Sequence, residues 1–373
     1  MKSIRIYCKN DGRYHDVPKG ATLEEVYETL DLNLPCCVTS CKVNNRVEGL
    51  HYTINDSRDL EYLTLASPSG LRTYTRSLFF VLYKAVRDLY PEAELRIGTP
   101  VAGGYFCRLA LPGGITPEVP ERLRRRMAEI VASDLPFRRV TAHTTDAIEV
   151  FRRQGFTRKV LLLESIGDLY THYYTLGDTV DYFYSALLLR TGQLTVFDLV
   201  PFGEGLLLRV PDSEHPERLR PMTDQHKMFS VFQEQHRRQE ILGCTTVGEL
   251  NTLIRADYTN DLVNVAEALQ EKQIAQIADH IASHDALRVV LIAGPSSSGK
   301  TTFAKRLSVQ LMACGKKPVS ISLDNYFVDR TLTPLDETGD YDFEHIEALT
   351  QPWFNAQRNR LLVGAEGEQP RYA

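Results

Sequence analysis

The chain has 373 residues, which is enough for two or three domains, and its 43% hydrophobic and 24% charged residues are ordinary for a globular protein. A formal net charge of −5 gives no overall attraction to nucleic acid or anionic membranes. The first residues lack the apolar core of a secretion signal, and no apolar stretch is long enough to cross a bilayer. The seven cysteines, three of them at Cys36, Cys37 and Cys41, show neither a disulfide framework nor zinc-ligand spacing. We therefore expect a reduced, cytoplasmic protein without a membrane partner.

Residues 1–66 are predicted to form a small α+β domain. Alternating apolar residues predict strands on both sides of the polar turn 10–12, and residues 22–25 have the form of a capping box that opens a helix. The stretch 43–47 predicts a tight hairpin, and 60–65 a closing strand. The segment 17–23, the hairpin and the final strand resemble the TGS domain, a ubiquitin-like β-grasp module. This resemblance implies docking or regulation rather than catalysis.

Residues 71–211 are predicted to form a second α+β domain, which opens with an amphipathic helix. Its landmarks are the stretches 90–98, 146–151, 159–164, 169–170 and 176–181. In this order and spacing they resemble the editing-like domain that follows TGS in threonyl-tRNA synthetases, also called the second additional domain.

The hydrolytic residues that this resemblance implies are replaced. The synthetase family uses a His-x-x-x-His pair on the first helix and a later Cys and His, and histidines one helical turn apart share a face. Here the register places Arg76 and Phe80 at the first pair and Phe183 and Leu187 at the later one. We therefore expect no editing hydrolysis, and a role as a scaffold, a small-molecule sensor or an RNA-facing module.

Other charged residues of this domain are interpreted as structural. His143 and His172 are expected to be structural or surface histidines, because each stands alone in the sequence. An arginine run with interleaved glutamates predicts a solvated helix face, since no aromatic residues alternate with it as in a stacking platform. The run consists of Arg122, Arg124, Arg125, Arg126, Arg138 and Arg139.

Residues 212–285 are predicted to form a helical connector. Residues 223–239 are polar with helical character, and apolar residues from Leu262 to Ile281 then keep helical spacing over several turns. We expect this second helix to pack against the domain that follows.

Residues 286–373 begin with the motif G-x-x-x-x-G-K-[ST] at 294–301, the phosphate-binding P-loop. The apolar run 288–293 predicts a parallel strand before it, and Phe303, Leu307 and Leu311 predict a helix after it. Backbone N–H groups of such a loop surround phosphate oxygens, Lys300 reaches the β- and γ-phosphates, and the Thr301 hydroxyl binds Mg²⁺. The predicted nucleotide-binding residues are Gly294, Pro295, Ser296, Ser297, Ser298, Gly299, Lys300, Thr301 and Thr302.

A second parallel strand is predicted at 319–323, with Asp324 at its carboxyl end, where ligands gather in α/β sheets. The block 324–344 resembles uridine kinase and its relatives. The resemblance implies that Asp324 accepts the proton of the nucleoside 5′-hydroxyl and contributes to the Mg²⁺ site, with Lys300 as the second catalytic residue. The implied substrate-binding residues are Asp324, Tyr326, Phe327, Arg330 and Glu344, the last replacing the family's usual Asp.

Together these observations predict a multidomain α+β and α/β protein that ends in a partial P-loop kinase domain. The predicted function is a nucleoside kinase that transfers phosphate from ATP or GTP, with Mg²⁺, to uridine or cytidine. The resemblance implies that the lid and base pocket lie beyond Ala373, so this chain alone is expected to be inactive as a kinase. Two alternatives stay open: a P-loop kinase for another alcohol, and an RNA- or tRNA-associated regulatory protein. A nucleic-acid partner is disfavoured, except for tRNA contact by the first two domains, and a homo-oligomer is left open.

Overall fold

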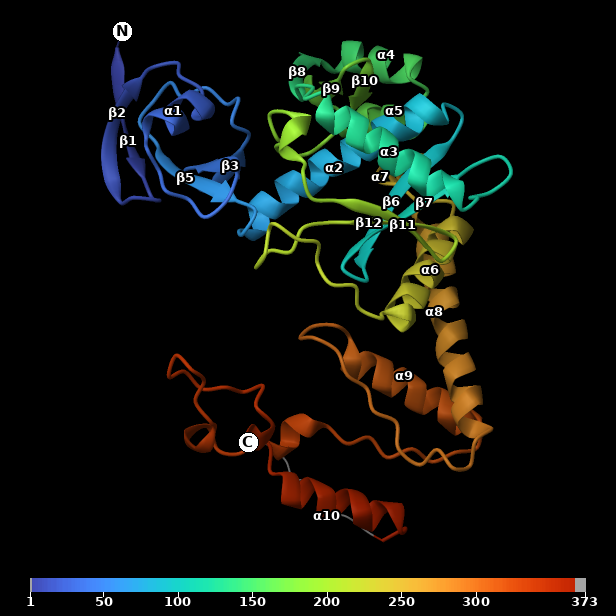
Figure 1. Ribbon diagram of the computed structural model, residues 1–373. Helices are drawn as coiled ribbons and strands as arrows, with labels where there is room; N and C mark the ends of the chain where they lie inside the picture. The colour runs from blue at the N-terminus through green and yellow to red at the C-terminus, as the bar shows by residue number, and fades with distance from the viewer. Residues whose placement is uncertain (1, 366–373) are drawn as a thin grey trace. The chain divides into compact units, whose positions relative to one another are not determined.

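The computed structural model describes residues 2–365 and divides the chain into two compact units, one ending at Tyr258 and the other beginning at Thr259. Each unit is described by itself (Figure 1). Among residues 2–365, no helix is both long and apolar enough to cross a membrane.

The first unit opens with a five-stranded sheet of the order β2-β1-β5-β3-β4, drawn in blue in Figure 1. β1 and β5 run parallel in its centre, and the other pairings are antiparallel. The strands are β1 (Ser3–Cys8), β2 (Arg13–Pro18), β3 (Val38–Val43), β4 (Arg46–Glu48) and β5 (Asp59–Thr64). Helix α1 (Leu23–Thr29) buries Leu23 and Val26 in the core of this domain. The predicted strands, helix and hairpin at 1–66 are present.

Local sequence signals explain two features of this sheet. Thr22 and Glu25 form the expected capping box, in which the Thr22 hydroxyl accepts from the Glu25 amide and the Glu25 carboxylate accepts from the Thr22 amide. Asn44 and Asn45 have φ of 46° and 68°, so the two-residue loop between β3 and β4 occupies the left-handed region that asparagine tolerates. The hairpin carries Arg46 and Glu48 on its second strand.

Helix α2 (Pro68–Leu89) leaves the sheet directly after β5 and forms the centre of the next domain. Its N-cap Ser67 accepts a hydrogen bond from the Gly70 amide. A Cβ atom at Gly70 would lie 2.0 Å from the Thr64 carbonyl oxygen, so only glycine allows the helix to start this close to β5. The close approach joins the two domains without a flexible linker.

The second domain of this unit packs two sheets around α2. One sheet has the order β11-β12-β7-β6 and the other β10-β9-β8. The strands are β6 (Glu94–Val101), β7 (Gly104–Ala110), β8 (Arg138–His143), β9 (Tyr170–Leu176), β10 (Thr179–Asp181), β11 (Asp198–Phe202) and β12 (Gly205–Arg209). The helices are α3 (Glu118–Ala132), α4 (Thr144–Arg153), α5 (Thr157–Ile166) and the short η1 (Thr191–Gln193). The buried face of α2, including Leu78 and Leu82, forms the centre of the core.

Two helices of the predicted connector belong to this first unit. Phe229 of α6 (His226–Ile241) packs edge-on against Phe106 at 4.8 Å and Phe202 at 5.1 Å between ring centroids. Gly248 of α7 (Val247–Arg255) lies so close to α5 that a Cβ atom would meet the Leu162 amide at 2.7 Å. The segment predicted as one connector is therefore divided at Tyr258 and Thr259.

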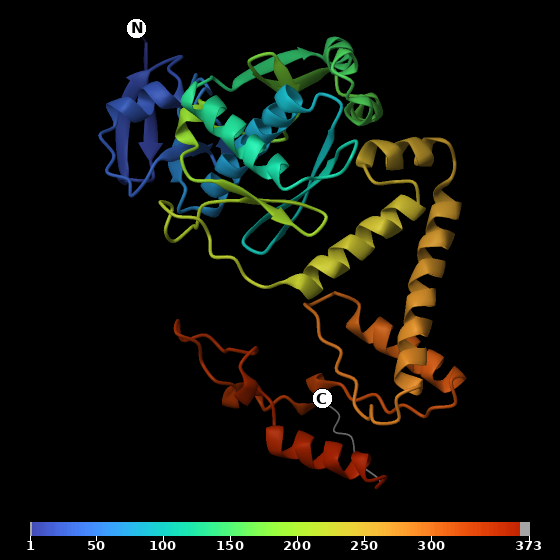
Figure 2. The ribbon, with the colours of Figure 1, turned by 45° about the vertical axis from the view of Figure 1, so that its right-hand side comes forward.

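In the second unit, the helix predicted after the P-loop is present as α9 (Lys300–Ala313). It packs against α8 (Thr259–Ala282), as expected for the second connector helix, and Figures 1 and 2 both show this contact. The small core joins Ile274 and Ala278 of α8 to Leu307 and Leu311 of α9. The remaining elements are η2 (Leu323–Tyr326), η3 (Arg330–Leu332), η4 (Ile346–Ala348) and α10 (Gln351–Leu362).

The parallel strands predicted at 288–293 and 319–323 are absent from the described residues, and this part of the fold prediction is not shown. A strand is stabilised by the backbone hydrogen bonds of its neighbours, and no such bond joins 288–293 to another described segment. Without a sheet, Leu291 and Val319 are 86% and 60% exposed. The predicted end of the kinase domain, 369–373, lies outside the described residues.

Candidate functional site

The predicted P-loop residues lie on a turn that leads into α9. Ser297 and Gly299 have φ of 58° and 83°, and the helix begins at Lys300. The Lys300 ammonium donates to the carbonyl oxygens of Gly294 at 2.7 Å and Pro295 at 2.8 Å, so the side chain folds back across the loop. Thr301 and Thr302 occupy the first turn of α9. The helix follows the loop directly, as the motif predicts, and binding of an anion at its N-terminus stays a prediction.

The residues predicted to hold the acceptor are not gathered around Lys300. Asp324 is exposed in η2, and its side chain accepts a hydrogen bond from the Ser322 hydroxyl at 3.4 Å. Tyr326 is 1% exposed and packs against Trp353 and Phe354.

The other predicted acceptor residues are also dispersed. Phe327 is half-buried and forms an isolated bridge with Leu349, Arg330 lies over the Phe343 ring, and Glu344 is exposed. Among the described residues, no hydrogen bond or ion pair joins Lys300 to Asp324, and no group of three or more His, Cys, Asp or Glu could hold a metal.

The four positions of the lost hydrolytic site do come together in the first unit. The Arg76 guanidinium donates to the Ala186 carbonyl oxygen from Nε at 3.3 Å and from Nη2 at 3.2 Å. The Phe80 and Phe183 rings are 5.4 Å apart, and Leu187 is fully buried beside them. The site is thus filled by apolar side chains and one arginine that is occupied by a backbone carbonyl.

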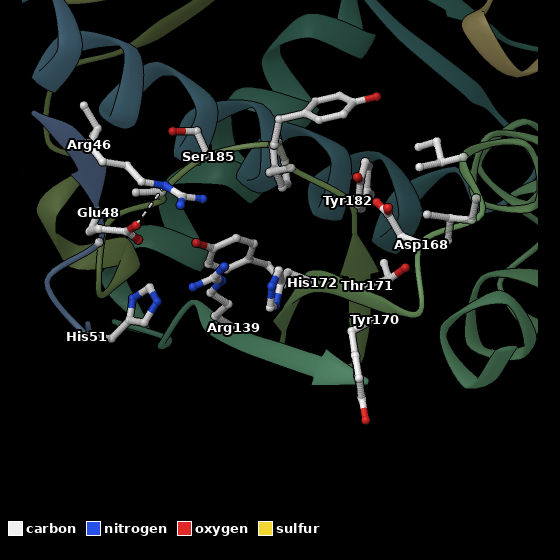
Figure 3. Close-up of a pocket in the computed structure, with 18 residues that line it drawn as sticks. Arg46, Glu48, His51, Arg139, Asp168, Tyr170, Thr171, His172, Tyr182 and Ser185 are labelled. Carbon is white, nitrogen blue, oxygen red and sulfur yellow. Dashed lines mark ion pairs between the residues drawn. The ribbon is translucent and has the colours of Figure 1, made fainter. Parts of the chain in front are cut away.

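A pocket lies next to these positions, between the β3–β4 hairpin and the β8–β9 sheet. Its cavity of about 190 Å³ is lined by residues from five sequence segments, and Figure 3 shows ten of them labelled. Arg46, Glu48 and His51 lie at one end, with Arg139 and His172 further in. The pocket lies at the interface between the two domains of the first unit, and residues from both domains line it.

Arg139 is the uncompensated cation of the pocket. The Arg46 Nε atom is 3.3 Å from Glu48 Oε1, whereas Arg139 has no ion pair or hydrogen bond from its side chain to any residue within 2–365. Arg139 faces Tyr174 across the β8–β9 ladder, and the next pair on that face is Thr141 and His172. Arg139 and His172 are therefore diagonal neighbours on one face of the sheet.

The surroundings of both histidines of the pocket favour the neutral imidazole. Burial lowers the pKa of His51 and of His172, and the positive charge of Arg139 lowers both further. The Thr141 hydroxyl is 2.7 Å from His172 Nδ1, which fixes the ring, and the His51 ring meets the edge of Tyr174 at 6.3 Å. Sequence reasoning treated His172 as a lone structural histidine because its neighbours come from distant segments.

Tyrosines form the other part of the lining. Tyr184 is 76% exposed and Tyr170 57% exposed, so both present their rings at the rim. Tyr182 lies inside this rim, with its ring 5.0 Å from that of Tyr184, and burial raises its pKa. Exposed tyrosines beside an unpaired arginine are suited to bind a ligand with aromatic rings and negative charge.

The arginine run at 122–126 does not contribute to this pocket. Arg126 binds Asp88 at 2.8 Å, Arg125 binds Glu121 at 3.4 Å, and Arg122 lies over the Tyr90 ring. Each of these arginines therefore has a partner within the chain, as predicted for a solvated helix face. Arg138 and Arg139, which were grouped with the run, have no such partner among residues 2–365, and of these two only Arg139 lines the pocket.

Known proteins similar to this chain are threonine–tRNA ligases. The protein from Desulforamulus reducens is 28% identical over 250 residues, which are 64% of this chain and 39% of the ligase. Those from Symbiobacterium thermophilum and Rubrobacter xylanophilus are 29% and 30% identical over 201 and 199 residues, just over half of this chain. The chain thus spans between 30% and 39% of the length of these curated relatives. No family model matches the sequence.

These relatives correct the predicted function. The nucleoside-kinase activity and the uridine-kinase assignment are wrong, because the similar proteins named above are threonine–tRNA ligases. Within residues 2–365 the parallel strands predicted for a kinase sheet are absent, and no hydrogen bond joins Lys300 to Asp324. The relatives support a TGS- and editing-like region and point to a function related to aminoacyl-tRNA synthetases.

Proposed function

We propose that the first unit binds the acceptor end of a tRNA as a recognition module and does not hydrolyse the aminoacyl ester. The observation that carries this proposal is the pocket between the β3–β4 hairpin and the β8–β9 sheet, where an unpaired arginine stands beside exposed tyrosines. The similar proteins act on tRNA, and their resemblance covers about half of this chain.

The lining of the pocket matches the chemistry of a single-stranded RNA end. Unstacked bases are recognised by stacking on aromatic side chains, and Tyr170 and Tyr184 offer exposed rings. Phosphate oxygens are bound by guanidinium groups, and Arg139 is free of protein carboxylates among the described residues. The double-stranded part of a tRNA carries no such unstacked bases, which favours the acceptor end.

The absence of hydrolysis follows from the four replaced positions. Ester hydrolysis needs a group that activates water and one that stabilises the oxyanion. Phe80, Phe183 and Leu187 have no titratable atom. Arg76 directs its donors to the Ala186 carbonyl oxygen, and burial lowers its pKa.

The second unit is proposed to bind a nucleoside triphosphate. Lys300 and Thr301 would hold the β- and γ-phosphates and Mg²⁺ of ATP or GTP, and the nucleotide would replace the two backbone carbonyls as the partner of the Lys300 ammonium. The Mg²⁺ would reach the protein chiefly through the nucleotide, which agrees with the absence of a metal-ligand cluster among the described residues.

The experiment uses the purified full chain. Fluorescence anisotropy compares its affinity for a deacylated tRNA with its affinity for an RNA hairpin of the same length but without a single-stranded end, over a range of salt concentrations. We expect tighter binding of the tRNA, with an affinity that falls as salt rises. Equal affinity for the two RNAs would contradict recognition of the acceptor end.

A second assay follows the release of radiolabelled amino acid from mischarged tRNA. We expect no acceleration above the rate without protein. Release that is fast and depends on protein concentration would contradict the proposed lack of hydrolysis.

A further inference from the structure

We infer that Arg139, His51 and His172 form a phosphate-binding site that takes up protons when its anion binds. This inference rests on the proposed function. It specifies that the part of the RNA that enters the pocket is a backbone or terminal phosphate. Its three residues differ from the four replaced hydrolytic positions, although Phe183 lines the same cavity, and they join the β-grasp domain to the domain built on α2.

The geometry places the three side chains around one space. Arg139 and His172 are diagonal neighbours on the β8–β9 face, and His51 reaches the same cavity from the segment after β4 (Figure 3). Tyr174, opposite Arg139 in the ladder, packs against the His51 ring at 6.3 Å and links the two ends of the group. A phosphate that meets Arg139 in this cavity is thus flanked by both imidazoles.

The other charged groups around the cavity do not satisfy Arg139. Glu48 is held by Arg46 on the hairpin, and Asp168 lines the cavity but makes no ion pair with a residue between 2 and 365. Arg46 lowers the pKa of His172 and Glu48 raises it, and both effects are smaller than that of Arg139. An anion is the ligand that would remove the unbalanced charge of Arg139.

Binding of an anion changes the protonation of the histidines. In the free protein, burial and Arg139 lower the pKa of both imidazoles. A bound phosphate offsets the charge of Arg139 and accepts hydrogen bonds from imidazolium groups, so it raises both pKa values. The affinity therefore increases as the pH falls from the bound-state pKa towards the free-state pKa, by up to about tenfold per pH unit for each histidine.

The first test measures the histidine pKa values by NMR in the full chain, with and without inorganic sulfate at constant ionic strength. Sulfate serves as the probe because its charge stays constant in this range, whereas phosphate monoesters titrate near pH 6. We expect sulfate to raise the pKa of His51 and of His172. The Arg139→Gln variant should abolish the shift.

Arg138→Gln is the matched control. It removes the same charge from the adjacent exposed position on β8, whose side chain points to the opposite face of the sheet. The inferred site would be overturned if sulfate did not raise the histidine pKa values in the wild type. It would also be overturned if the rise persisted in Arg139→Gln.

The second test measures tRNA affinity between pH 8.0 and 5.5. We expect at least about a fivefold gain on acidification in the wild type and none in Arg139→Gln. Binding of tRNA that weakens in Arg139→Gln but does not change with pH would overturn the proton linkage and leave the proposed function standing. Absence of tRNA binding, with the sulfate shift intact, would overturn the proposed function and assign the site to a free anion.

Discussion

Replacement of Asp88 by Asn tests the network that holds β9 and β10 against α2. The Lys84 side chain is 8% exposed, and its ammonium lies 3.2 Å from Asp88 Oδ1 and 2.8 Å from Asp178 Oδ1. Asp88 also accepts from Arg126 of α3 at 2.8 Å. Asp88 is therefore the shared partner of two cations on two helices, whereas Asp178 on the β9–β10 turn contacts one.

The burial of the two aspartates sets the expected magnitudes. Removal of one partner from a buried ion pair costs about 3–5 kcal/mol, because the other charge stays buried. The Asp88 side chain is 19% exposed and Asp178 remains beside Lys84, so we expect Asp88→Asn to lower the free energy of unfolding by about 2–3 kcal/mol. Asp178 is 85% exposed, and we expect Asp178→Asn to cost about 0–1 kcal/mol.

The assay combines urea denaturation with hydrogen exchange. The single tryptophan, Trp353, lies in the second unit and does not report on this network, so far-UV circular dichroism should follow unfolding. Peptides of α2 and α3 should exchange faster in Asp88→Asn, and those of α8 and α9 should not change. Equal destabilisation by the two substitutions, or a loss below about 0.5 kcal/mol for Asp88→Asn, would refute the reasoning.

Four further predictions follow from single residues. Hydrogen bonding to Lys84 lowers the pKa of Asp178 below its ordinary 3.8. The small difference in unfolding free energy between the wild type and Asp178→Asn, measured by urea titration, should therefore be present at pH 7. It should vanish as the pH falls through the pKa that Asp178 has in the folded state. Gly70→Ala should cost about 2 kcal/mol in the same titration, because its Cβ would lie 2.0 Å from a backbone oxygen, and a cost near zero would contradict the close approach. Asn45→Val should cost about 1–2 kcal/mol, since a β-branched residue at φ 68° is strained, and Asn45→Gly serves as the control. Lys300→Ala should abolish binding of a fluorescent ATP analogue and leave tRNA affinity within twofold, so a parallel loss of tRNA binding would contradict independent sites.

Local signals allowed much of the first unit to be predicted. The Thr22–Glu25 capping box and the Asn44–Asn45 turn each specify their conformation within a few residues, and both are present in the structure. The replaced positions Arg76 and Phe80 could also be located, because they lie one turn apart on a single helix. Their position against Phe183 was implied by a resemblance and is matched by the ring contact.

The second unit shows the limit of local signals. The apolar run 288–293 has the composition of a buried strand, but a strand also needs neighbours to complete its hydrogen bonds, and its residues alone do not supply them. The helix that begins at Lys300 needs no distant partner for its backbone bonds, and it was predicted correctly.

The pocket could not be predicted because its residues come from distant parts of the sequence. His51 follows a hairpin strand of one domain, whereas Arg139 and His172 lie on paired strands of another. The register of β8 against β9 places Arg139 beside His172, and no sequence pattern at either position indicates that pairing. Grouping Arg139 with the neighbouring arginine run concealed that this arginine lines the pocket and has no ion-pair partner among the described residues.

The affinity of the full chain for deacylated tRNA in wild type, Arg139→Gln and Arg138→Gln tests the central claim most directly. We predict that Arg139→Gln weakens binding about tenfold, which corresponds to the loss of about 1.4 kcal/mol. The slope of log affinity against log salt concentration should decrease by about one, the value for one lost phosphate contact. Arg138→Gln should stay within about twofold of the wild type. Equal weakening by both substitutions, or none by either, would contradict the assignment of the pocket as the site where the RNA end binds.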